Sequence, residues 1–518
     1  MNSLSSSLPF SIVPRKRLDL SFPLLLRASS RALASHATGS GHAGARSSAA
    51  SLSRSFSPAA SLPVLPSLSV RSSFDLLLGA LGLPPGSEVL CTPINIDGMV
   101  AVARAHRLRM VPVDIDTGTL LPSVAELAGK VTERTRVLLV ASVFGAAVPL
   151  KPLVPLCKKH GLVLVSDAAE SFTSLSGAAG EEEEVADVTF YSFGTIKTSS
   201  CVGGGVAVIK SAEIAAEMGR LQGAYPVMPD SWFAKKAGKT ALLHAVSTPF
   251  VYGLLLNAAL LLGLDYDSII TSLTRGFAPK KDGSVDGLSL LKQIRNRPPP
   301  SLLRCMADNL RPDGQGARDA RLYADKRVSV CLAAQALIGS ECKNVTLLGH
   351  LNEDHVYWLF PVLVDKPDEV CRKMVRGGFD VTRGTSQLGC VEAYMGVPEG
   401  DRVCAEAEKI FQRLVYLPVT PEMDDKTMER MVAVLKRATE AEGREKVGKR
   451  GGGLKHPPPL LFAVLAAAVA LYNTSSLLRF AWAVVAVGVK LFLLLSALTV
   501  YVTYMHGGAY LKPTLLSK

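Results

Sequence analysis

Two ionisable side chains, thirty residues apart, could do chemistry together. Asp167 directly follows the apolar run 162–166, and Lys197 lies in the segment 192–205, which is rich in hydroxyl groups and glycine. A lysine can form a Schiff base with an aldehyde once its pKa is brought towards neutrality, and desolvation has that effect. A carboxylate can keep a pyridine nitrogen protonated, so that the ring accepts electrons. The pair therefore predicts a pyridoxal 5'-phosphate (PLP) site whose phosphate is held by loop hydroxyls and amides.

Each of these features also has a simpler interpretation. A strand-ending aspartate commonly caps a helix, and a loop lysine is commonly a solvated charge. The glycines at 203–205 can serve only to turn the chain into the next strand. The three features occur together, however, within a regular alternation of helices and strands. That combination favours a cofactor site over three separate structural roles.

The pair lies where short apolar runs alternate with helical segments. This pattern is typical of a mostly parallel sheet with helices on both faces, so we predict an α/β fold. Ligands of such sheets bind beyond the carboxyl ends of the strands, which is where Asp167 and Lys197 fall. We expect helices at residues 72–82, 95–106, 121–131 and 150–160, and strands at residues 88–92, 109–113, 136–141, 162–166, 185–191 and 205–209.

Changes in composition divide the 518 residues into six parts. We predict a transit-like disordered segment (1–60), a large PLP-binding domain (61–215), a helical insertion (216–330), a small C-terminal α/β domain (331–440), a basic linker (441–458) and an apolar helical tail (459–505). Within the insertion, the apolar run 241–264 is interrupted by His244, Pro249 and Gly253. These interruptions favour a buried or membrane-surface pair of helices over a membrane span.

The N-terminal segment is rich in Ser, Ala and Arg, and Asp19 is the one acid among its first sixty residues. Such a composition is typical of an organellar transit peptide, and a plain disordered tail is the alternative. The composition does not distinguish a plastid from a mitochondrion.

The C-terminal tail is strongly apolar, and residues 480–504 contain a single charge, Lys490. A helix of this length can span the hydrocarbon core of a bilayer, so we predict a membrane-associated protein. The alternative is a helical hairpin that packs on the enzyme.

The net charge of +12 does not indicate a nucleic-acid partner. Much of the excess lies in the N-terminal segment and beside the tail, and no basic stripe is interleaved with aromatic residues. No two of the nine cysteines stand at CxxC spacing, and no HExxH motif is present. We therefore predict buried, reduced thiols and no metal site.

Further segments extend the pattern around the aspartate and the lysine. These are LGLPPGSEV at 81–89, VPVDID at 111–116 and the aromatic-glycine pair Phe144-Gly145. Together they resemble the DegT/DnrJ/StrS-type aminotransferases, a PLP-dependent family best known for acting on nucleotide-linked keto-sugars. The resemblance covers residues 71–218 and 358–435, roughly half of the chain. It implies an aspartate-aminotransferase-like fold (fold type I) and a homodimer with sites at the subunit interface.

The resemblance also implies roles for individual residues. It assigns the Schiff base to Lys197 and the pyridine nitrogen of PLP to Asp167, as inferred above. Ser192 corresponds to a phosphate-contacting serine, and Ala169 would lie under the cofactor ring. Ser72 and Ser73 would begin the helix whose N-terminal amides face the phosphate.

The chain departs from the family pattern at four positions. Glu170 stands where the family usually has a glutamine beside the phenolic oxygen of PLP. Ile96 stands where an aromatic ring usually stacks on the cofactor, and Ser142 and Thr198 replace a usual histidine and asparagine. The segment 241–264 occupies the part of the chain where the family has a loop that reaches the partner's cofactor.

The function expected from these residues is PLP-dependent transamination. A small-molecule donor would give its amino group to the cofactor, and a keto or aldehyde acceptor, including a sugar or sugar-nucleotide, would then take it. Elimination or decarboxylation at the same cofactor is one alternative. A membrane-anchored scaffold with this fold and no activity is the other.

Overall fold

The computed structural model describes residues 41–58, 61–175, 185–261, 287–384 and 386–440, together with residue 270 and several positions between 9 and 30. The chain divides into two units, Met1–Gly443 and Arg444–Lys518. All the elements described below belong to the first unit. The predicted linker (441–458) and tail (459–505) lie outside the described residues.

A seven-stranded sheet forms the centre of the large domain. Its strand order is β1-β8-β7-β6-β5-β2-β4. The strands from β4 to β7 pair in parallel, whereas β8 pairs antiparallel with both β7 and β1. The strands are β1 (Val64–Ser67), β2 (Glu88–Cys91), β4 (Arg109–Pro112), β5 (Thr135–Ala141), β6 (Val163–Asp167), β7 (Val188–Ser192) and β8 (Gly205–Ile209). The predicted α/β fold with a mostly parallel sheet is confirmed.

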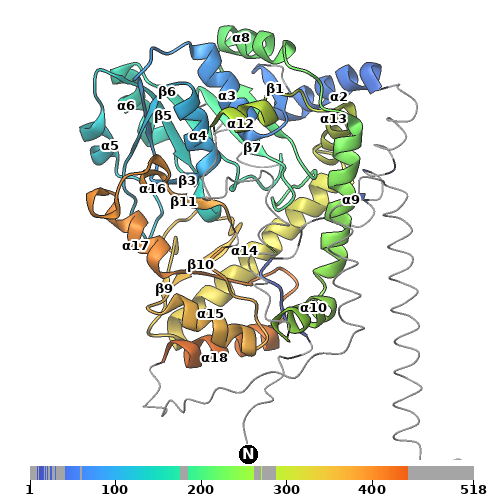
Figure 1. Cartoon of the computed structure of the whole chain (residues 1–518), viewed down its shortest axis with the longest axis vertical. Coiled ribbons are helices and arrows are strands. Elements are labelled where there is room, and N and C mark those ends of the chain that lie inside the picture. Colours follow the sequence, from blue (N-terminus) through green and yellow to red (C-terminus); the bar gives the residue numbers. More distant parts are fainter. Residues whose placement is uncertain are drawn as a thin grey trace, which may run out of the picture. The chain divides into compact units, whose positions relative to one another are not determined.

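Helices cover both faces of this sheet (Figure 1). Successive side chains of a strand point to opposite faces, and those of β5 do so. Val137 and Leu139 pack with α3 (Val70–Leu81), α4 (Asp97–Ala105) and α12 (Gly287–Ile294), whereas Leu138 and Val140 pack with α5 (Val124–Lys130) and α6 (Val154–His160). The continuous apolar runs seen in the sequence are therefore strands that are buried on both sides.

The small domain is built on a three-stranded antiparallel sheet in the order β12-β10-β9. Its elements are α14 (Gln315–Glu341), β9 (Thr346–Leu347), β10 (Phe360–Leu363), α15 (Pro367–Arg376), α17 (Ala405–Arg413), β12 (Leu414–Leu417) and α18 (Asp425–Thr439). The long helix α14 runs continuously through the predicted domain boundary at 330/331, so the helical insertion and the small domain share this helix.

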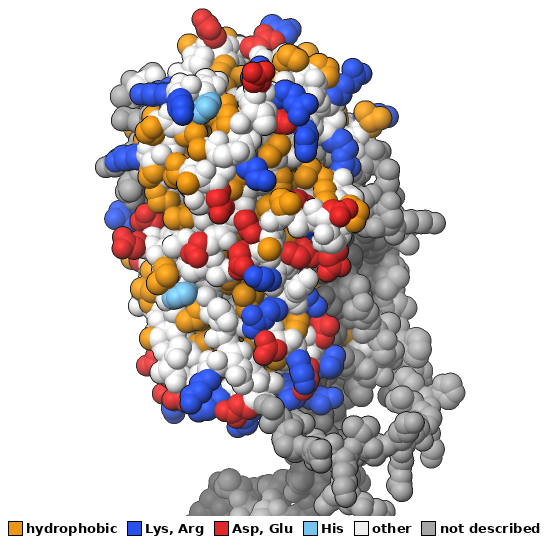
Figure 2. Space-filling view, turned by 90° about the vertical axis from the view of Figure 1, so that its left-hand side faces the viewer, with side chains coloured by type: hydrophobic (Ala, Val, Ile, Leu, Met, Phe, Trp, Pro, Cys, Tyr) orange, Lys and Arg blue, Asp and Glu red, His pale blue; other side chains and the backbone are white. Residues whose placement is uncertain are grey.

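A short two-stranded sheet joins the two domains. β3 (Ile94–Ile96) of the large domain pairs antiparallel with β11 (Leu388–Cys390), and α16 (Val391–Met395) follows at once. On the side of the molecule that carries α5, α6 and α17, Lys and Arg side chains are interspersed with Asp and Glu (Figure 2).

Further α-helices among the described residues are α8 (Ala212–Gly223), α9 (Asp230–Val246), α10 (Pro249–Leu261) and α13 (Pro300–Asn309). Among the described helices, none is long and apolar enough by itself to cross a membrane. Asp230–Val246 and Pro249–Asn257 meet the criteria of length and composition as a pair, with a bend of 88° at the break between them.

The structure differs from the predicted disordered segment 1–60 at helix α2 (Gly41–Phe56). Leu52 and Phe56 lie one helical turn apart and are buried in the core between α2, α9 and α13. The ring of Phe56 lies 5.5 Å from that of Tyr191 and 6.0 Å from that of Phe172. Because the other α2 residues are mostly small or polar, two apolar side chains were too weak a signal to reveal this helix.

Residues 11–16, which we call the strap, also pack on the fold. Val13 lies beside Phe379 in a parallel bridge, and its amide donates to the carbonyl of Gly378 at 2.9 Å. The buried guanidinium of Arg15 makes a two-pronged ion pair with Asp380, at 2.7 and 3.1 Å. The hydroxyl of Tyr252 on α10 donates to the same carboxylate. The strap thus connects the small domain to α10.

We predict that Arg15→Met lowers the free energy of unfolding by about 3–5 kcal/mol, because it leaves the fully buried carboxylate of Asp380 without its counter-charge. Urea unfolding measures this loss. As a control, Arg413→Met removes an exposed pair with Asp365, and such pairs contribute little. Equal losses in the two variants would mean that the strap does not pack as described.

Candidate active site

The structure brings the predicted aspartate and lysine into one cavity. Asp167 is the last residue of β6, and Ser192 is the last residue of the neighbouring parallel strand β7. The segment between Ser192 and Gly205 crosses the same edge of the sheet and carries Lys197. The cavity of about 720 Å³ is lined by Asp167, Ala169, Glu170, Ser192, Lys197 and Ile96, among others. This volume falls within the ~300–1,000 Å³ that is usual for small-molecule sites.

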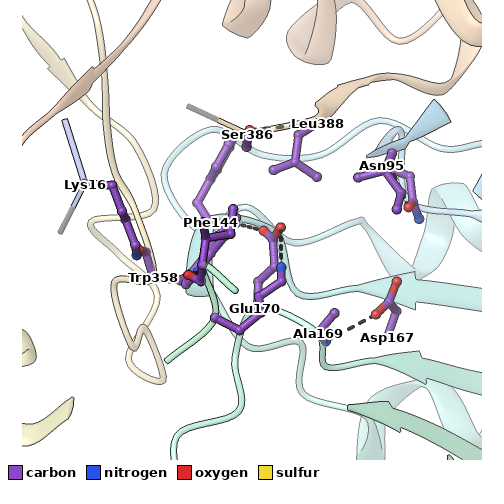
Figure 3. A network of polar contacts seen from close by, with 12 residues as sticks. Lys16, Asn95, Phe144, Asp167, Ala169, Glu170, Trp358, Ser386 and Leu388 are labelled. Carbon is purple, nitrogen blue, oxygen red and sulfur yellow. Dashed lines mark hydrogen bonds and ion pairs between the residues drawn. The ribbon is translucent and has the colours of Figure 1, made fainter. Parts of the chain in front are cut away.

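Asp167 is buried, and its carboxylate accepts a hydrogen bond of 3.2 Å from the amide of Ala169 (Figure 3). Desolvation disfavours the charged form and raises the pKa of Asp167 to about 6. The Ala169 amide and the cations of Lys197 and Arg71 oppose this rise. A buried carboxylate with a pKa near neutrality can take or release a proton under physiological conditions.

Glu170 connects Lys197 to the turn at Phe144. Its carboxylate accepts from the Lys197 Nζ at 3.2 Å and from the Phe144 amide at 2.9 Å. Burial raises the pKa of Glu170, and the nearby Lys197 cation and the Phe144 amide partly offset that rise. The carboxylate therefore holds the lysine amine at a defined position in the cavity.

The turn at Phe144 and Gly145 has a demanding backbone. Phe144 adopts a φ of 59° and Gly145 a φ of 102°. A Cβ atom on Gly145 would lie 2.5 Å from the backbone nitrogen of Trp358, so only glycine fits against the small domain here. The pair Phe144-Gly145 therefore directs the Phe144 amide towards Glu170 and allows the backbone of Trp358 to approach closely.

Trp358 is a site residue that sequence reasoning missed. The Lys197 Nζ lies 3.9 Å from the centroid of its ring, in the geometry of a cation–π contact. The indole nitrogen donates to the Ile196 carbonyl at 2.9 Å, and Lys16 of the strap donates to the Trp358 carbonyl at 2.8 Å. An aromatic residue within an apolar run was the only available signal, and it does not indicate which residues the ring will contact.

Ser72 and Ser73 do not line the cavity. Helix α3 begins earlier than predicted, with Ser69 as its N-cap. The Ser72 hydroxyl donates to the Ile294 carbonyl at 2.9 Å, and the Ser73 hydroxyl lies 2.7 Å from that of Ser67. Ser69, Val70 and Arg71 reach the cavity from this helix terminus instead.

Ile96 lies in the cavity wall at the end of β3, opposite Leu388 of β11. Ser386, Gln387 and Leu388 therefore enter the wall from the small domain, although nothing in the sequence pattern indicated them. The adjacent Asn95 also lines the cavity, and its buried side-chain nitrogen has no hydrogen-bond partner among the described residues. A ligand with an acceptor atom would satisfy this donor.

These residues fit PLP. The site offers the buried carboxylate of Asp167 at a strand end, the Lys197 amine held by Glu170, the Ser192 hydroxyl, a helix N-terminus and the unsatisfied donor of Asn95. The fold and the site together define a PLP-dependent transferase of the aspartate-aminotransferase type.

Residues 69–239 match the model of the DegT/DnrJ/EryC1/StrS aminotransferase family. PLP is the cofactor that such enzymes use.

Solved structures share the fold at low sequence identity. The aminotransferase PseC of Helicobacter pylori, involved in pseudoaminic acid biosynthesis, is 13% identical with a TM-score of 0.55, covering 84% of this chain and 99% of PseC. DesV of S. venezuelae is 17% identical with a TM-score of 0.56, covering 82% of this chain and 100% of DesV. NtdA of Bacillus subtilis, which contains the bound cofactor PMP, is 17% identical with a TM-score of 0.56, covering 85% of this chain and 86% of NtdA. At these identities the likeness establishes the fold.

The raised pKa of Asp167 predicts a pH effect on the stability of the cofactor-free protein. The pKa of Asp167 is about 6 in the folded protein and about 3.8 in the unfolded chain. Between these two pH values the folded state binds more protons than the unfolded chain. The free energy of unfolding therefore falls as the pH rises. Asparagine does not titrate, so Asp167→Asn removes this fall. Between pH 4 and pH 7 the free energy of unfolding of the variant should rise by about 2–3 kcal/mol relative to that of the wild type. Denaturant unfolding at both pH values measures it.

The exposed Asp325, replaced by asparagine, is the matched control for this experiment. If Asp167→Asn and Asp325→Asn change stability with pH in the same way, burial does not raise the pKa of Asp167.

Proposed function

We propose that the protein is a PLP-dependent aminotransferase, which transfers an amino group from a small-molecule donor to a keto or aldehyde acceptor. The observation that carries this proposal is the contact between Glu170 and Lys197 in the cavity that also holds the buried Asp167. A sugar or sugar-nucleotide acceptor is supported by the similar structures, among them the sugar aminotransferase CalS13 and DesI solved with its TDP-sugar product.

When PLP is bound, it supplies the electron sink for chemistry at the carbon that bears the amino group. Asp167 would hold a proton at the pyridine nitrogen, and the resulting positive charge would compensate the cost of burying this carboxylate. Lys197 would supply the amine that binds the cofactor aldehyde, and its Nζ would move the proton at the substrate carbon.

Glu170 and Trp358 control the position of Lys197. The carboxylate of Glu170 holds the amine on one side, and the indole ring covers it on another. The buried ring also keeps water away from the amine, which strengthens the electrostatic interactions within the site. Both residues therefore act on the reaction through the lysine.

The direct test is covalent attachment of the cofactor. We predict that borohydride reduction of the holoenzyme, followed by peptide mass mapping, finds the pyridoxyl group on Lys197. Lys197→Arg should lose the label and reduce amino-group transfer by about 10²–10⁴-fold, because the proton shuttle is lost. Lys236→Arg changes another lysine of the cavity and should keep the label on Lys197. A label on Lys236 would contradict the assignment, and product formation without amino transfer would indicate elimination or decarboxylation.

We also predict that Glu170→Gln retains the cofactor but changes the pH dependence of its absorbance. Glu170 lies 3.2 Å from the Lys197 Nζ, so loss of its negative charge makes a cation there less stable. The apparent pKa of the cofactor–lysine group should therefore fall in a spectrophotometric titration. Glu392→Gln, a change at an equally buried glutamate that binds the amides of Val403 and Cys404, should leave the titration unchanged. Identical titrations of the wild type and Glu170→Gln would refute the role.

We further propose that the enzyme works as a homodimer and that residues 459–505 anchor it in a membrane, in an organelle. Residues 480–504 would form a helix of about 37 Å, longer than the ~30 Å hydrocarbon core. The surrounding apolar residues can offset much of the ~2.5–3.5 kcal/mol cost of Lys490 near the middle of the bilayer. Light scattering on the purified protein tests the dimer.

Membrane anchoring predicts that alkaline carbonate leaves the full-length protein in the membrane pellet of expressing cells. A truncated protein that ends at Gly443, where the first unit ends, should be released into the supernatant. Equal release of the two proteins would show that the tail is not an integral anchor.

A further inference from the structure

The N-terminal strap reaches the reacting lysine through the side chain of Lys16. Its Nζ donates to the Trp358 carbonyl at 2.8 Å and lies 5.3 Å from the centroid of the indole ring. The Lys197 Nζ lies 3.9 Å from the same centroid. In the view of Figure 3, Lys16 and Glu170 lie on either side of Trp358. Two amines and one carboxylate are thus gathered around this residue.

Buried contacts fix the strap in place. The amide of Asp380 donates to the Val13 carbonyl at 2.9 Å, in addition to the bond that the Val13 amide makes. Arg15, which precedes Lys16 in the chain, is buried together with its partner Asp380. Because these contacts hold the backbone next to Lys16, its amine has a defined position at Trp358, unlike the amine of a lysine that moves freely in solvent.

Further residues of the N-terminal segment pack against the loop that carries Lys197. Phe193 and Cys201 stand four residues before and after the lysine, and the Cys201 amide donates to the Phe193 carbonyl at 3.0 Å, which closes the loop. The ring of Phe193 lies 6.1 Å from that of Phe56. The core that contains Phe193 and Cys201 also contains buried apolar residues of the N-terminal segment, namely Leu18, Leu20, Leu25, Ala28, Leu52 and Phe56. The base of the loop therefore rests on residues that precede position 60.

This packing restricts how the chain can be shortened. Residues 1–60 have the composition of a transit peptide, which is cut off after import. Removal of the whole segment would take away the Arg15–Asp380 pair, the Lys16 contact and helix α2. It would also expose apolar side chains beneath the lysine loop to water, which is unfavourable. A processing event compatible with this fold leaves the chain intact from Ser11 onward.

We infer that the strap is retained in the working enzyme and that Lys16 is a positioning residue, which acts on Lys197 through Trp358. Retention follows from the packing alone, whereas the positioning role rests on the proposed aminotransferase function. The Lys16 ammonium group holds the backbone of Trp358, and thereby the indole ring that covers the reacting amine. Its charge also acts on the site: burial raises the pKa of Glu170, and the Lys16 cation is one of the charges that oppose this rise.

Lys16 belongs to a larger set of charged groups around Lys197. Arg327 of α14 donates to the hydroxyl of Thr198, the residue after the lysine, at 3.0 Å. The other charged groups line the cavity, and these are Asp167 and Glu170 after β6, Arg71 of α3, Lys235, Lys236 and Lys239 of α9, and Lys292 of α12. A cation at Lys16 disfavours a second cation at Lys197, whereas the carboxylate of Glu170 favours it. Removal of the Lys16 charge and removal of the Glu170 charge should therefore move the titration of the cofactor–lysine group in opposite directions.

The test of positioning is the pH titration of the cofactor absorbance in the full-length holoenzyme. Lys16→Met should raise the apparent pKa of the cofactor–lysine group by roughly 0.3–1 pH unit, since a neighbouring cation is lost. Lys16→Arg keeps a cation and a donor at this position and should restore the wild-type titration. The matched control is Lys326→Met, which removes the same charge from an exposed position of α14 and should leave the titration unchanged.

The direction of the shift separates positioning from a purely structural role. A loss of stability alone would leave the titration of the folded holoenzyme in place. Identical titrations of the wild type and Lys16→Met, a fall of the apparent pKa, or an equal shift in Lys326→Met would each overturn the role of Lys16. A wild-type protein that shows no cofactor absorbance at all would reject the proposed aminotransferase function instead, and retention of the strap would still be decided by mass.

The intact mass of the protein from its native cells tests retention, and this measurement needs neither cofactor nor turnover. A mature chain that begins at or before Ser11 would support the inference. A mature chain that begins after Ser11 would overturn it, because such a chain lacks part of the strap.

Discussion

The burial of two carboxylates beside one amine dominates this structure. Asp167 and Glu170 lie within three residues of each other at the carboxyl edge of the sheet, and desolvation raises the pKa of both carboxyl groups. Lys197 compensates Glu170 directly, at 3.2 Å. Among the described residues, only the Ala169 amide donates a hydrogen bond to Asp167, and this carboxylate is suited to a cationic ring nitrogen. The charge of Asp167 would thus be balanced only by the cationic ring nitrogen of the bound cofactor.

The small domain supplies part of the surroundings of the Lys197 amine. Its Trp358 packs over Lys197, and its backbone approaches Gly145 so closely that a side chain there would collide. The pairing of β3 with β11 brings a second small-domain segment into the cavity wall. The cavity therefore depends on the packing of two domains, and a change that separates them would alter the surroundings of the lysine before it altered the sheet.

Helix α9 brings three lysines to a cavity that already holds the cations of Arg71 and Lys197. The strap adds a second element of its own, since Arg15 and Lys16 fasten it to Asp380 and to Trp358. Both additions act on the same small volume around Lys197, although they lie more than two hundred residues apart.

The sequence by itself determined the central sheet and the positions of Asp167 and Lys197 at its edge. Apolar runs that alternate with helices specify buried parallel strands, and the carboxyl ends of these strands meet at one edge, so Asp167 and Lys197 were predictable from local pattern. Ser192 was expected from the resemblance to the family. Helix α2 was not, because Leu52 and Phe56 are only two apolar residues among many small ones. The exact start of α3 was also missed, which is why Ser72 and Ser73 were expected at a position that Ser69, Val70 and Arg71 occupy.

Only the tertiary structure decided what surrounds the lysine. Trp358, Leu388, Lys16 and the lysines of α9 come from segments far apart in the chain, and no periodicity records their meeting. Their positions follow from long-range packing: the β3–β11 pair, the approach at Gly145 and the buried Arg15–Asp380 ion pair. Local patterns reflect interactions between residues near in sequence, whereas the shape and charge of a cavity are set by contacts across hundreds of residues.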